Sequence, residues 1–223
     1  MSKNVMAFIE LLAHRGLWEQ LEERNQPKAL EAALRAGFGV ETDIRDFQGT
    51  LVISHDMPNG EEQTFEQFLA QYQALGCKST LALNIKADGM AKQIQALLEQ
   101  FQVTNYFCFD MAIPDLLAYW QSGMTYFARR SEYEPLTPIT DIAPGIWLDA
   151  FQGQWFSVDD IWEHLKRGQD VCVVSPELHR RDYETTWHQL VELRDRLNSL
   201  DSATQEAAGQ LMLCTDFPQK FPV

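Results

Sequence analysis

Two acidic residues in the N-terminal half of the chain, Glu41 and Asp43, are separated by a single residue. In an extended strand, residues two apart point to the same face, so the two carboxylates should lie side by side. Two like charges are costly to bury unless a cation lies between them, so the spacing indicates a metal site. The alternative is an exposed edge strand with one polar face. His14 and His55 flank the pair in the sequence, which favours a functional site over isolated structural histidines.

Further polar residues accompany these groups. Arg15 and Gly16 follow His14, and a glycine there lets the backbone turn sharply and approach a ligand closely. Asn84 and Lys86 stand at the end of a later apolar run. A lysine at the end of a strand can bind an anion, and an asparagine offers a neutral oxygen to a hard cation. A simpler role for Asn84 is to cap the turn that follows it.

These groups need elements that bring them to one edge of a sheet. Short apolar runs predict strands over Ala7–Ala13, Gly39–Ile44, Thr50–Ser54, Thr80–Ile85, Tyr106–Phe109, Thr125–Ala128, Gly145–Leu148, Val171–Val174 and Leu211–Cys214. Longer amphipathic stretches predict helices over Pro27–Ala36, Thr64–Leu75, Ala87–Gln100, Pro114–Gln121, Val158–Lys166 and Tyr183–Leu197.

The alternation of buried strands and helices predicts an α/β fold with a parallel sheet and right-handed crossovers. Thr50–Ser54 follows the preceding strand too closely for a crossover helix, so it should be an addition to that unit. Eight strands then remain, which predicts a single (β/α)8 TIM barrel, with a doubly wound open sheet as the alternative. Arg129–Pro144 has three prolines and no periodicity, so it is either a long loop or a degenerate fifth helix.

The composition predicts one acidic globular domain over residues 1–223. The chain has 18 Lys and Arg against 32 Asp and Glu, a net charge of −14, and 45% hydrophobic residues. The acid excess argues against nucleic acid or an anionic membrane as partner. No apolar run approaches the ~18 residues that span a bilayer, and the N-terminus resembles a strand more than a signal peptide. We therefore expect a cytoplasmic protein without stable membrane association; the sequence does not indicate an oligomeric state.

The motifs together resemble those of a known family. They are His14-Arg15-Gly16, Glu41-x-Asp43, His55-Asp56 and Ile85-Lys86, with Thr215-Asp216-Phe217-Pro218 near the C-terminus. This set is similar to the signature of the glycerophosphodiester phosphodiesterase family, which belongs to the phosphatidylinositol-phospholipase-C-like barrels. The likeness in motifs extends from about His14 to Lys86 and returns near the end. Between Phe101 and Gln210 it is mostly a likeness of fold.

The resemblance implies hydrolysis of a small phosphodiester substrate and a role in lipid metabolism. It implies that His14 and His55 are the catalytic acid/base pair. In this family a substrate hydroxyl is thought to attack phosphorus, with one histidine as base. The other histidine protonates the leaving alkoxide, and water then opens the cyclic phosphate. A pair of imidazoles can exchange these roles near neutral pH, which agrees with that assignment.

The resemblance also implies a divalent metal cofactor, Mg2+ or Ca2+, held by Glu41 and Asp43, with Arg15 and Lys86 as contacts to the phosphate. One position departs from the family, because Asn84 stands where an acidic third ligand is usual. We expect Asn84 to serve as a neutral oxygen ligand, with weaker binding of the metal. The sequence leaves three other hypotheses open: a barrel that binds phosphate without turnover, a metal-independent lyase, and a phospholipase.

Weaker candidates lie at the ends of later strands. Asp110 could supply the missing acidic ligand or cap the next helix. Arg129 could bind a second anionic group of the substrate or belong to a solvated loop. Glu177, with His179 beside it, could line the pocket and bind substrate.

Two histidines fall inside predicted helices rather than at strand ends. His164 and His188 lie far from any candidate strand end, so both are expected at the surface.

Overall fold

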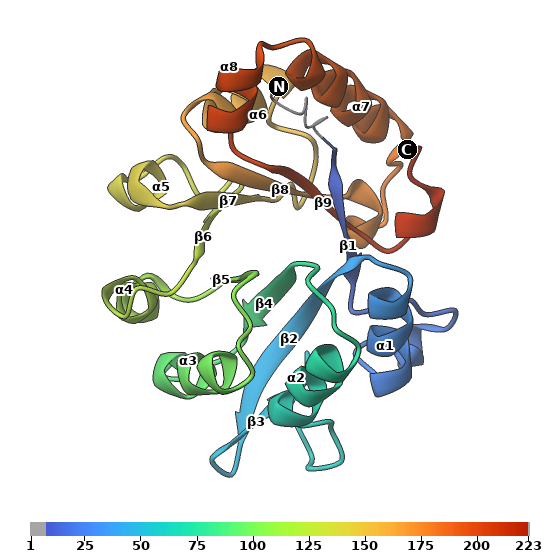
Figure 1. The fold of residues 1–223 in the computed structure, drawn as a ribbon, viewed down its shortest axis with the longest axis vertical. Coiled ribbons are helices and arrows are strands. Elements are labelled where there is room, and N and C mark those ends of the chain that lie inside the picture. The colour runs from blue at the N-terminus through green and yellow to red at the C-terminus, as the bar shows by residue number, and fades with distance from the viewer. Residues whose placement is uncertain (1–7, 223) are drawn as a thin grey trace. The chain divides into compact units, whose positions relative to one another are not determined.

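A computed structural model describes residues 8–222 (Figure 1). The strands are β1 (Glu10–His14), β2 (Gly39–Phe47), β3 (Thr50–Ile53), β4 (Leu81–Ile85), β5 (Tyr106–Phe109), β6 (Phe127–Arg130), β7 (Gly145–Leu148), β8 (Asp170–Val174) and β9 (Leu211–Thr215). The helices are α1 (Pro27–Arg35), α2 (Phe65–Ala74), α3 (Ala91–Gln100), α4 (Ile113–Gln121), α5 (Pro138–Ile142), α6 (Val158–Lys166), α7 (Glu184–Asn198) and α8 (Ser202–Ala207), besides three short 3-10 helices.

The strand order confirms the predicted fold class. Neighbouring strands follow the order β5-β4-β2-β1-β9-β8-β7-β6, and the pairs β5–β4, β4–β2, β2–β1, β9–β8, β8–β7 and β7–β6 are parallel. β3 alone is off this path and pairs with β2 in an antiparallel sense, as expected of a small addition to that unit. Eight parallel strands joined by helices are the topology of a (β/α)8 TIM barrel.

The chain divides into two compact units, of which the first spans Leu12–Tyr126. Its strands β2 and β4 are paired in a register that sets Glu41 opposite Ala82 and Asp43 opposite Asn84. β1 pairs with β2 so that His14 lies opposite Glu41. The register therefore brings the predicted site residues of three strands to one edge of this sheet.

The second unit consists of residues 8–11 and 127–222. Its strands β6 to β9 are parallel neighbours in sequence order, with Leu148 opposite Val173 and Val174 opposite Cys214. All of β7 and β9 is buried. This matches the continuous apolar runs expected of strands that are covered on both faces.

Local sequence signals explain where the helices begin and end. Thr64 caps α2 by accepting a hydrogen bond from the Gln67 amide, and the Gln67 side chain accepts one from the Thr64 amide. α1 has Pro27 in its first turn and ends before Gly37.

The helices differ from prediction by more than one residue at three places. α3 begins at Ala91 rather than Ala87, and α5 is a five-residue helix, so the Arg129–Pro144 segment contains the degenerate fifth helix. α8 was not predicted; Asp201 caps it by accepting from the Thr204 amide. The predicted strand Ala7–Ala13 begins at a residue outside the described part of the chain. Within residues 8–222, no helix has the length and apolar character needed to span a bilayer.

Candidate active site

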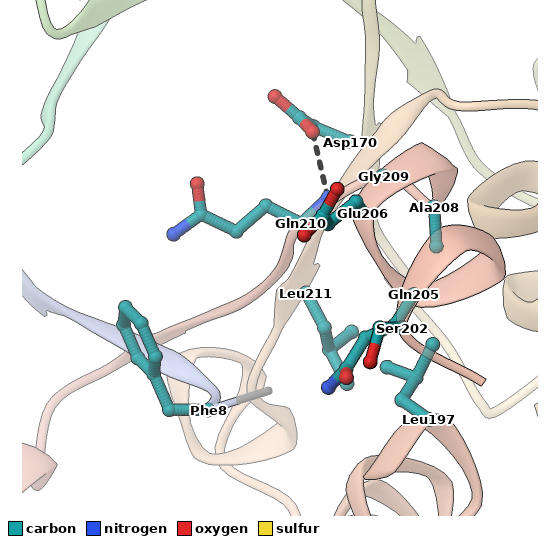
Figure 2. Close-up of a pocket in the computed structure, with 10 residues that line it drawn as sticks. All are labelled: Phe8, Asp170, Leu197, Ser202, Gln205, Glu206, Ala208, Gly209, Gln210 and Leu211. Carbon is teal, nitrogen blue, oxygen red and sulfur yellow. Dashed lines mark hydrogen bonds between the residues drawn. The ribbon is translucent and has the colours of Figure 1, made fainter. Parts of the chain in front are cut away.

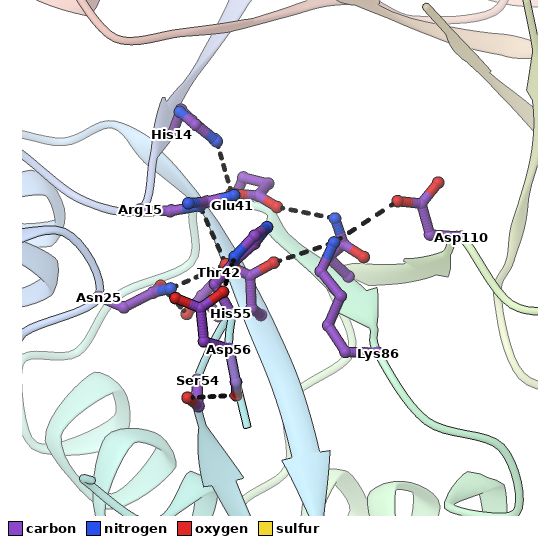
Figure 3. A network of polar contacts seen from close by, with 12 residues as sticks. His14, Arg15, Asn25, Glu41, Thr42, Ser54, His55, Asp56, Lys86 and Asp110 are labelled. Carbon is purple, nitrogen blue, oxygen red and sulfur yellow. Dashed lines mark hydrogen bonds and ion pairs between the residues drawn. The ribbon is translucent and has the colours of Figure 1, made fainter. Parts of the chain in front are cut away.

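Glu41 and Asp43 lie on β2 in the first unit, and both are almost completely buried. Burial of two carboxylates in one strand requires compensation by cations or hydrogen-bond donors. The two carboxylates receive this compensation to different extents. Figure 3 shows the side chains around them.

Asp43 is surrounded by positive charge. The Nε of Arg15 lies 3.0 Å from its Oδ2, and the Nζ of Lys86 lies 3.3 Å from its Oδ1. Burial by itself would raise the pKa of Asp43, but the charges of Arg15 and Lys86 outweigh burial and lower that pKa. Asp43 is therefore ionised, and both of its oxygens face cations.

Glu41 has much weaker compensation. Asn84 Nδ2 donates to its Oε1 at 3.3 Å, and His14 Nε2 lies 3.9 Å from its Oε2. Burial, followed by the charge of Asp43, raises the pKa of Glu41 to about 8. Within the described residues, Glu41 Oε2 and the Oδ1 of Asn84 are buried and accept no hydrogen bond. Glu41 and Asn84, on neighbouring strands, thus each have a buried open oxygen; Asp43 Oδ1 also accepts no hydrogen bond from the described residues but faces Lys86.

The backbone after β1 turns sharply to place His14 and Arg15. Arg15 and Gly16 both have positive φ, 57° and 93°. A Cβ at Gly16 would lie 2.5 Å from the carbonyl carbon of Ala29, so only glycine fits there. The Arg15 amide donates to the Glu41 carbonyl at 2.9 Å, which fastens this turn to β2.

His55 lies in the loop after β3 and is exposed, with 46% of its side chain accessible. Its Nδ1 is 2.8 Å from Asp56 Oδ1, and its carbonyl accepts from the Nε of Arg45 at 3.0 Å. His55 makes a small electrostatic contribution that lowers the pKa of Asp43, so the imidazole lies within electrostatic range of that carboxylate. The ring atom not engaged by Asp56 is Nε2, which is the atom available to a substrate.

The donor set in the first unit fits a hard divalent cation. Carboxylate and amide oxygens are the ligands that Mg2+ and Ca2+ prefer, and the open oxygens of Glu41 and Asn84 are of this kind. Asp43 adds a carboxylate whose Oδ1 faces Lys86. Residues 8–222 contain no group of three His, Cys, Asp or Glu side chains that could hold a metal, so an amide oxygen would have to complete a three-ligand set.

Asp110, considered as a replacement for the missing acid, lies directly after β5 with a positive φ of 71°. Its Oδ2 is 3.8 Å from Lys86 Nζ. The helix that follows is capped at Ala112, with no side-chain hydrogen bond. Asp110 therefore contributes a second negative charge to Lys86, and it does not cap α4.

The second unit carries a separate set of polar residues on β6 and after β7 and β8. The predicted strand Thr125–Ala128 is displaced by two residues, so that Arg129 lies on β6 rather than after it. Arg129 forms a two-point ion pair with Glu134, at 2.7 and 2.9 Å. Glu177 accepts hydrogen bonds from the hydroxyls of Ser175 and Thr215 and, at 3.1 Å, from the Asp216 amide. Arg129 and Glu177, predicted to bind substrate, thus have protein partners in this structure, and their predicted role stays a prediction.

In the second unit, Asp149 was not predicted as a candidate, and His164 was wrongly predicted to be exposed. Asp149, directly after β7, lies 2.7 Å from His179 Nε2. The signal for it was present, because an acid that directly follows a buried strand is the pattern that singled out Asp110. His164 is buried rather than exposed; its Nε2 is 3.2 Å from Arg130 Nη1 and its Nδ1 is 2.8 Å from Gln169 Oε1. His188 is exposed, as predicted.

A cavity of about 330 Å3 lies elsewhere in the second unit (Figure 2). Asp170 and Leu211, the first residues of β8 and β9, line it together with Phe8 and Gln205. Asp170 accepts a hydrogen bond from the Gln210 amide at 2.7 Å. This cavity is at the amino ends of the strands, whereas catalytic residues of such folds lie at the carboxyl ends.

Comparison with known proteins bears on the fold. No family model and no curated protein matches the sequence. A glycerophosphodiester phosphodiesterase from Agrobacterium tumefaciens matches with a TM-score of 0.66 and 13% identity, over 96% of this chain and 99% of that chain. The chain has the fold of glycerophosphodiester phosphodiesterases. The resemblance drawn from the motifs is thus confirmed at the level of fold.

Two further solved structures share this fold. A phosphodiesterase from Oleispira antarctica, in complex with its product sn-glycerol-3-phosphate, matches with a TM-score of 0.62 and 16% identity, over 95% of this chain and 94% of that one. A Ca2+-dependent phosphatidylinositol-specific phospholipase C from Streptomyces antibioticus matches with a TM-score of 0.60 and 13% identity, over 96% of both chains. At these identities the function has to be argued from the residues of the site.

Proposed function

We propose that the protein hydrolyses a small glycerophosphodiester-like phosphodiester to a phosphomonoester and an alcohol. The cluster on β1, β2 and β4 is its active site, and a divalent cation, Mg2+ or Ca2+, assists the reaction. The fold shared with phosphodiesterases supports this assignment, and so does the Oleispira antarctica relative, which is described with a phosphate-ester product.

The observation that carries the proposal is the contrast between the two buried carboxylates. Asp43 is neutralised by Arg15 and Lys86, whereas Glu41 keeps a buried oxygen that accepts no hydrogen bond from the described residues, as does Asn84 on the neighbouring strand. A buried carboxylate with a raised pKa and an unused oxygen is strongly stabilised by a cation. Glu41, Asp43 and Asn84 are therefore the metal ligands of the proposal.

The charges of the site suit an anionic diester. With Glu41 ionised, the two carboxylates balance Arg15 and Lys86, and Asp110 adds one negative charge beside Lys86, so a divalent cation would leave the cluster with one net positive charge. When bound, the cation would stabilise negative charge on the phosphoryl oxygens. Arg15 and Lys86 orient the phosphate and share in that stabilisation.

The two histidines supply proton transfer. Asp56 holds Nδ1 of His55 and leaves Nε2 to exchange a proton with the substrate. His14 Nε2 lies 3.9 Å from Glu41, so an ionised Glu41 favours protonated His14. One imidazole removes a proton from the substrate hydroxyl that attacks phosphorus while the other donates a proton to the leaving alkoxide. Water then opens the resulting cyclic phosphate to the phosphomonoester. Arg129 and Glu177 are proposed as additional substrate contacts.

The test is phosphorus NMR of a panel of glycerophospho-alcohols and sugar-linked diesters. Each sample contains Mg2+, Ca2+ or a chelator, with wild type, His14→Ala, His55→Ala and the control His188→Ala, which alters an exposed histidine. We expect turnover that depends on the metal and falls by about 10²–10⁴-fold in either active-site variant.

Three outcomes of this panel would contradict the proposal. Turnover that is unaffected by the chelator would remove the metal from the mechanism. Equal rates in His14→Ala and His188→Ala would remove His14 from it. Ligand binding without any turnover would favour a phosphate-binding barrel.

A further inference from the structure

The loop between β1 and α1 returns to the active site at Asn25. Asn25 has a positive φ of 61°, a conformation that asparagine adopts more readily than most other residues. Its backbone N–H donates to the backbone carbonyl of Arg15 at 2.9 Å, which holds the end of the loop against the turn that contains Arg15. The backbone thus places the side chain of residue 25 against β2.

Both ends of the Asn25 side chain are engaged by β2 (Figure 3). Its Nδ2 donates to Asp43 Oδ2 at 2.8 Å, and its Oδ1 accepts from Thr42 Oγ1 at 2.8 Å. An ionised carboxylate can only accept hydrogen bonds, so the NH2 group must face Asp43. Thr42 then donates to the carbonyl end, which holds the amide in that orientation.

We propose that Asn25 is the positioning residue for Asp43: its amide holds Oδ2 against Arg15 so that Oδ1 stays turned toward Lys86 and the metal site. This inference rests on the proposed function, because the importance of Oδ1 follows from the proposal that Asp43 is a metal ligand. It adds a residue that contacts neither phosphate nor metal and that determines which oxygen of Asp43 is presented.

The chemistry of residue 25 is specific. An alanine would leave Oδ2 with Arg15 alone, and the carboxylate could then rotate about its Cβ–Cγ bond. An aspartate would have the same shape but would place a second negative charge about where the donor lies, 2.8 Å from Asp43 Oδ2. Groups that orient a metal ligand in this way typically contribute about 10–100-fold in metal affinity or activity.

The test compares wild type with Asn25→Ala and the isosteric Asn25→Asp. The matched control is Asn105→Ala, which removes an exposed asparagine that donates to the Lys78 carbonyl in the same unit. Calorimetry measures the binding of Mn2+, and kcat and KM are determined with the diester that the panel identifies. Crystal structures of the metal-free proteins show the side-chain rotamer of Asp43. We expect the Mn2+ dissociation constant to rise and kcat to fall by about 10–100-fold, with a smaller change in KM.

The proposal is overturned if Asn25→Ala binds Mn2+ as wild type does and keeps Asp43 in the same rotamer. If Asn25→Ala does not fold, Asn25→Asp, whose melting temperature is checked first, decides in the same way. If wild type neither binds Mn2+ nor hydrolyses any diester, the proposed function fails instead. The crystal structures then decide alone, since an unchanged Asp43 rotamer overturns the positioning role and a rotated carboxylate supports it.

Discussion

Glu41, on β2 of the first unit, and Glu177, in the 3-10 helix that follows β8 in the second, differ in the hydrogen bonds that their oxygens accept. Glu177 receives two hydroxyl donors and a backbone amide, which occupy both of its oxygens. Glu41 receives a single long hydrogen bond, and its Oε2 is buried and accepts none from the described residues. A carboxylate with all its hydrogen bonds made stabilises a loop, whereas a buried one with an unused oxygen, as in Glu41, is the kind of group for which we propose metal binding.

The two arginines Arg15 and Arg129 repeat this contrast. Arg129 is paired with the half-exposed Glu134 through two hydrogen bonds. Arg15 is paired with the fully buried Asp43, which it shares with Lys86. A pair near the solvent contributes little to stability, while a cation beside a buried carboxylate determines its charge state. The first unit therefore contains a buried carboxylate whose charge state is determined by neighbouring cations.

The largest expected effect is the dependence of the free energy of unfolding on pH in the absence of metal. The pKa of Glu41 is raised to about 8, whereas an unfolded glutamate ionises near the model value of 4.5. Between these values the folded state keeps a proton that the unfolded state has lost. The free energy of unfolding should therefore fall as pH rises through this window, by up to about 1.4 kcal/mol per pH unit.

Urea unfolding in the presence of a chelator measures this slope. Glu41→Gln, which has the same shape and cannot ionise, should flatten it, and saturating Mg2+ or Ca2+ should oppose it because the cation binds the ionised form. An identical slope in wild type and Glu41→Gln would show that Glu41 is not the group responsible.

Glu177 provides the opposite test. Ser175 and Thr215 are completely buried and donate to it, so Glu177→Ala should lower the free energy of unfolding by about 1–3 kcal/mol. Chemical denaturation measures this, with the exposed Glu192→Ala in α7 as control, expected within about 0.5 kcal/mol of wild type. The predicted contact of Glu177 with substrate requires, in addition, a raised KM in the same variant. If Glu177→Ala has the same free energy of unfolding as Glu192→Ala, the hydrogen bonds of Glu177 do not stabilise the fold, which would contradict this prediction.

The smallest effect is expected for the pair of Arg129 and Glu134. A double-mutant cycle with Arg129→Met and Glu134→Gln should give a coupling energy below about 1 kcal/mol, decreasing with salt. If Arg129 binds a second anionic group of the substrate, Arg129→Met should also raise KM for such diesters. A coupling that is large and independent of salt would mean that the pair is structurally as important as the contacts of Glu177.

Much of the fold could be predicted because buried parallel strands have continuous apolar sequences. The predicted Tyr106–Phe109 and Gly145–Leu148 are β5 and β7 as observed. The same logic located His14, Glu41 and Asn84, since each lies on a strand and the register of parallel strands brings them together. Residues positioned by strands are predictable because their neighbours follow from the pairing.

The remaining residues depend on contacts that no short pattern contains. Asn25 lies in a loop, and its role arises when that loop folds back on β2 over a separation of 18 positions. His164 has a helical pattern around it, and its burial follows from the packing of α6 beside Arg130. α8 is short and has Asp201 as its main signal, which is weak without a longer apolar stripe.

The central claim is that the open oxygens of Glu41 and Asn84 hold a divalent cation, and calorimetric titration of Mg2+ and Ca2+ into metal-free protein tests it most directly. We predict one ion bound per chain by wild type and none at the same concentrations by Glu41→Gln. Absence of binding to wild type, or binding that Glu41→Gln leaves unchanged, would contradict the account.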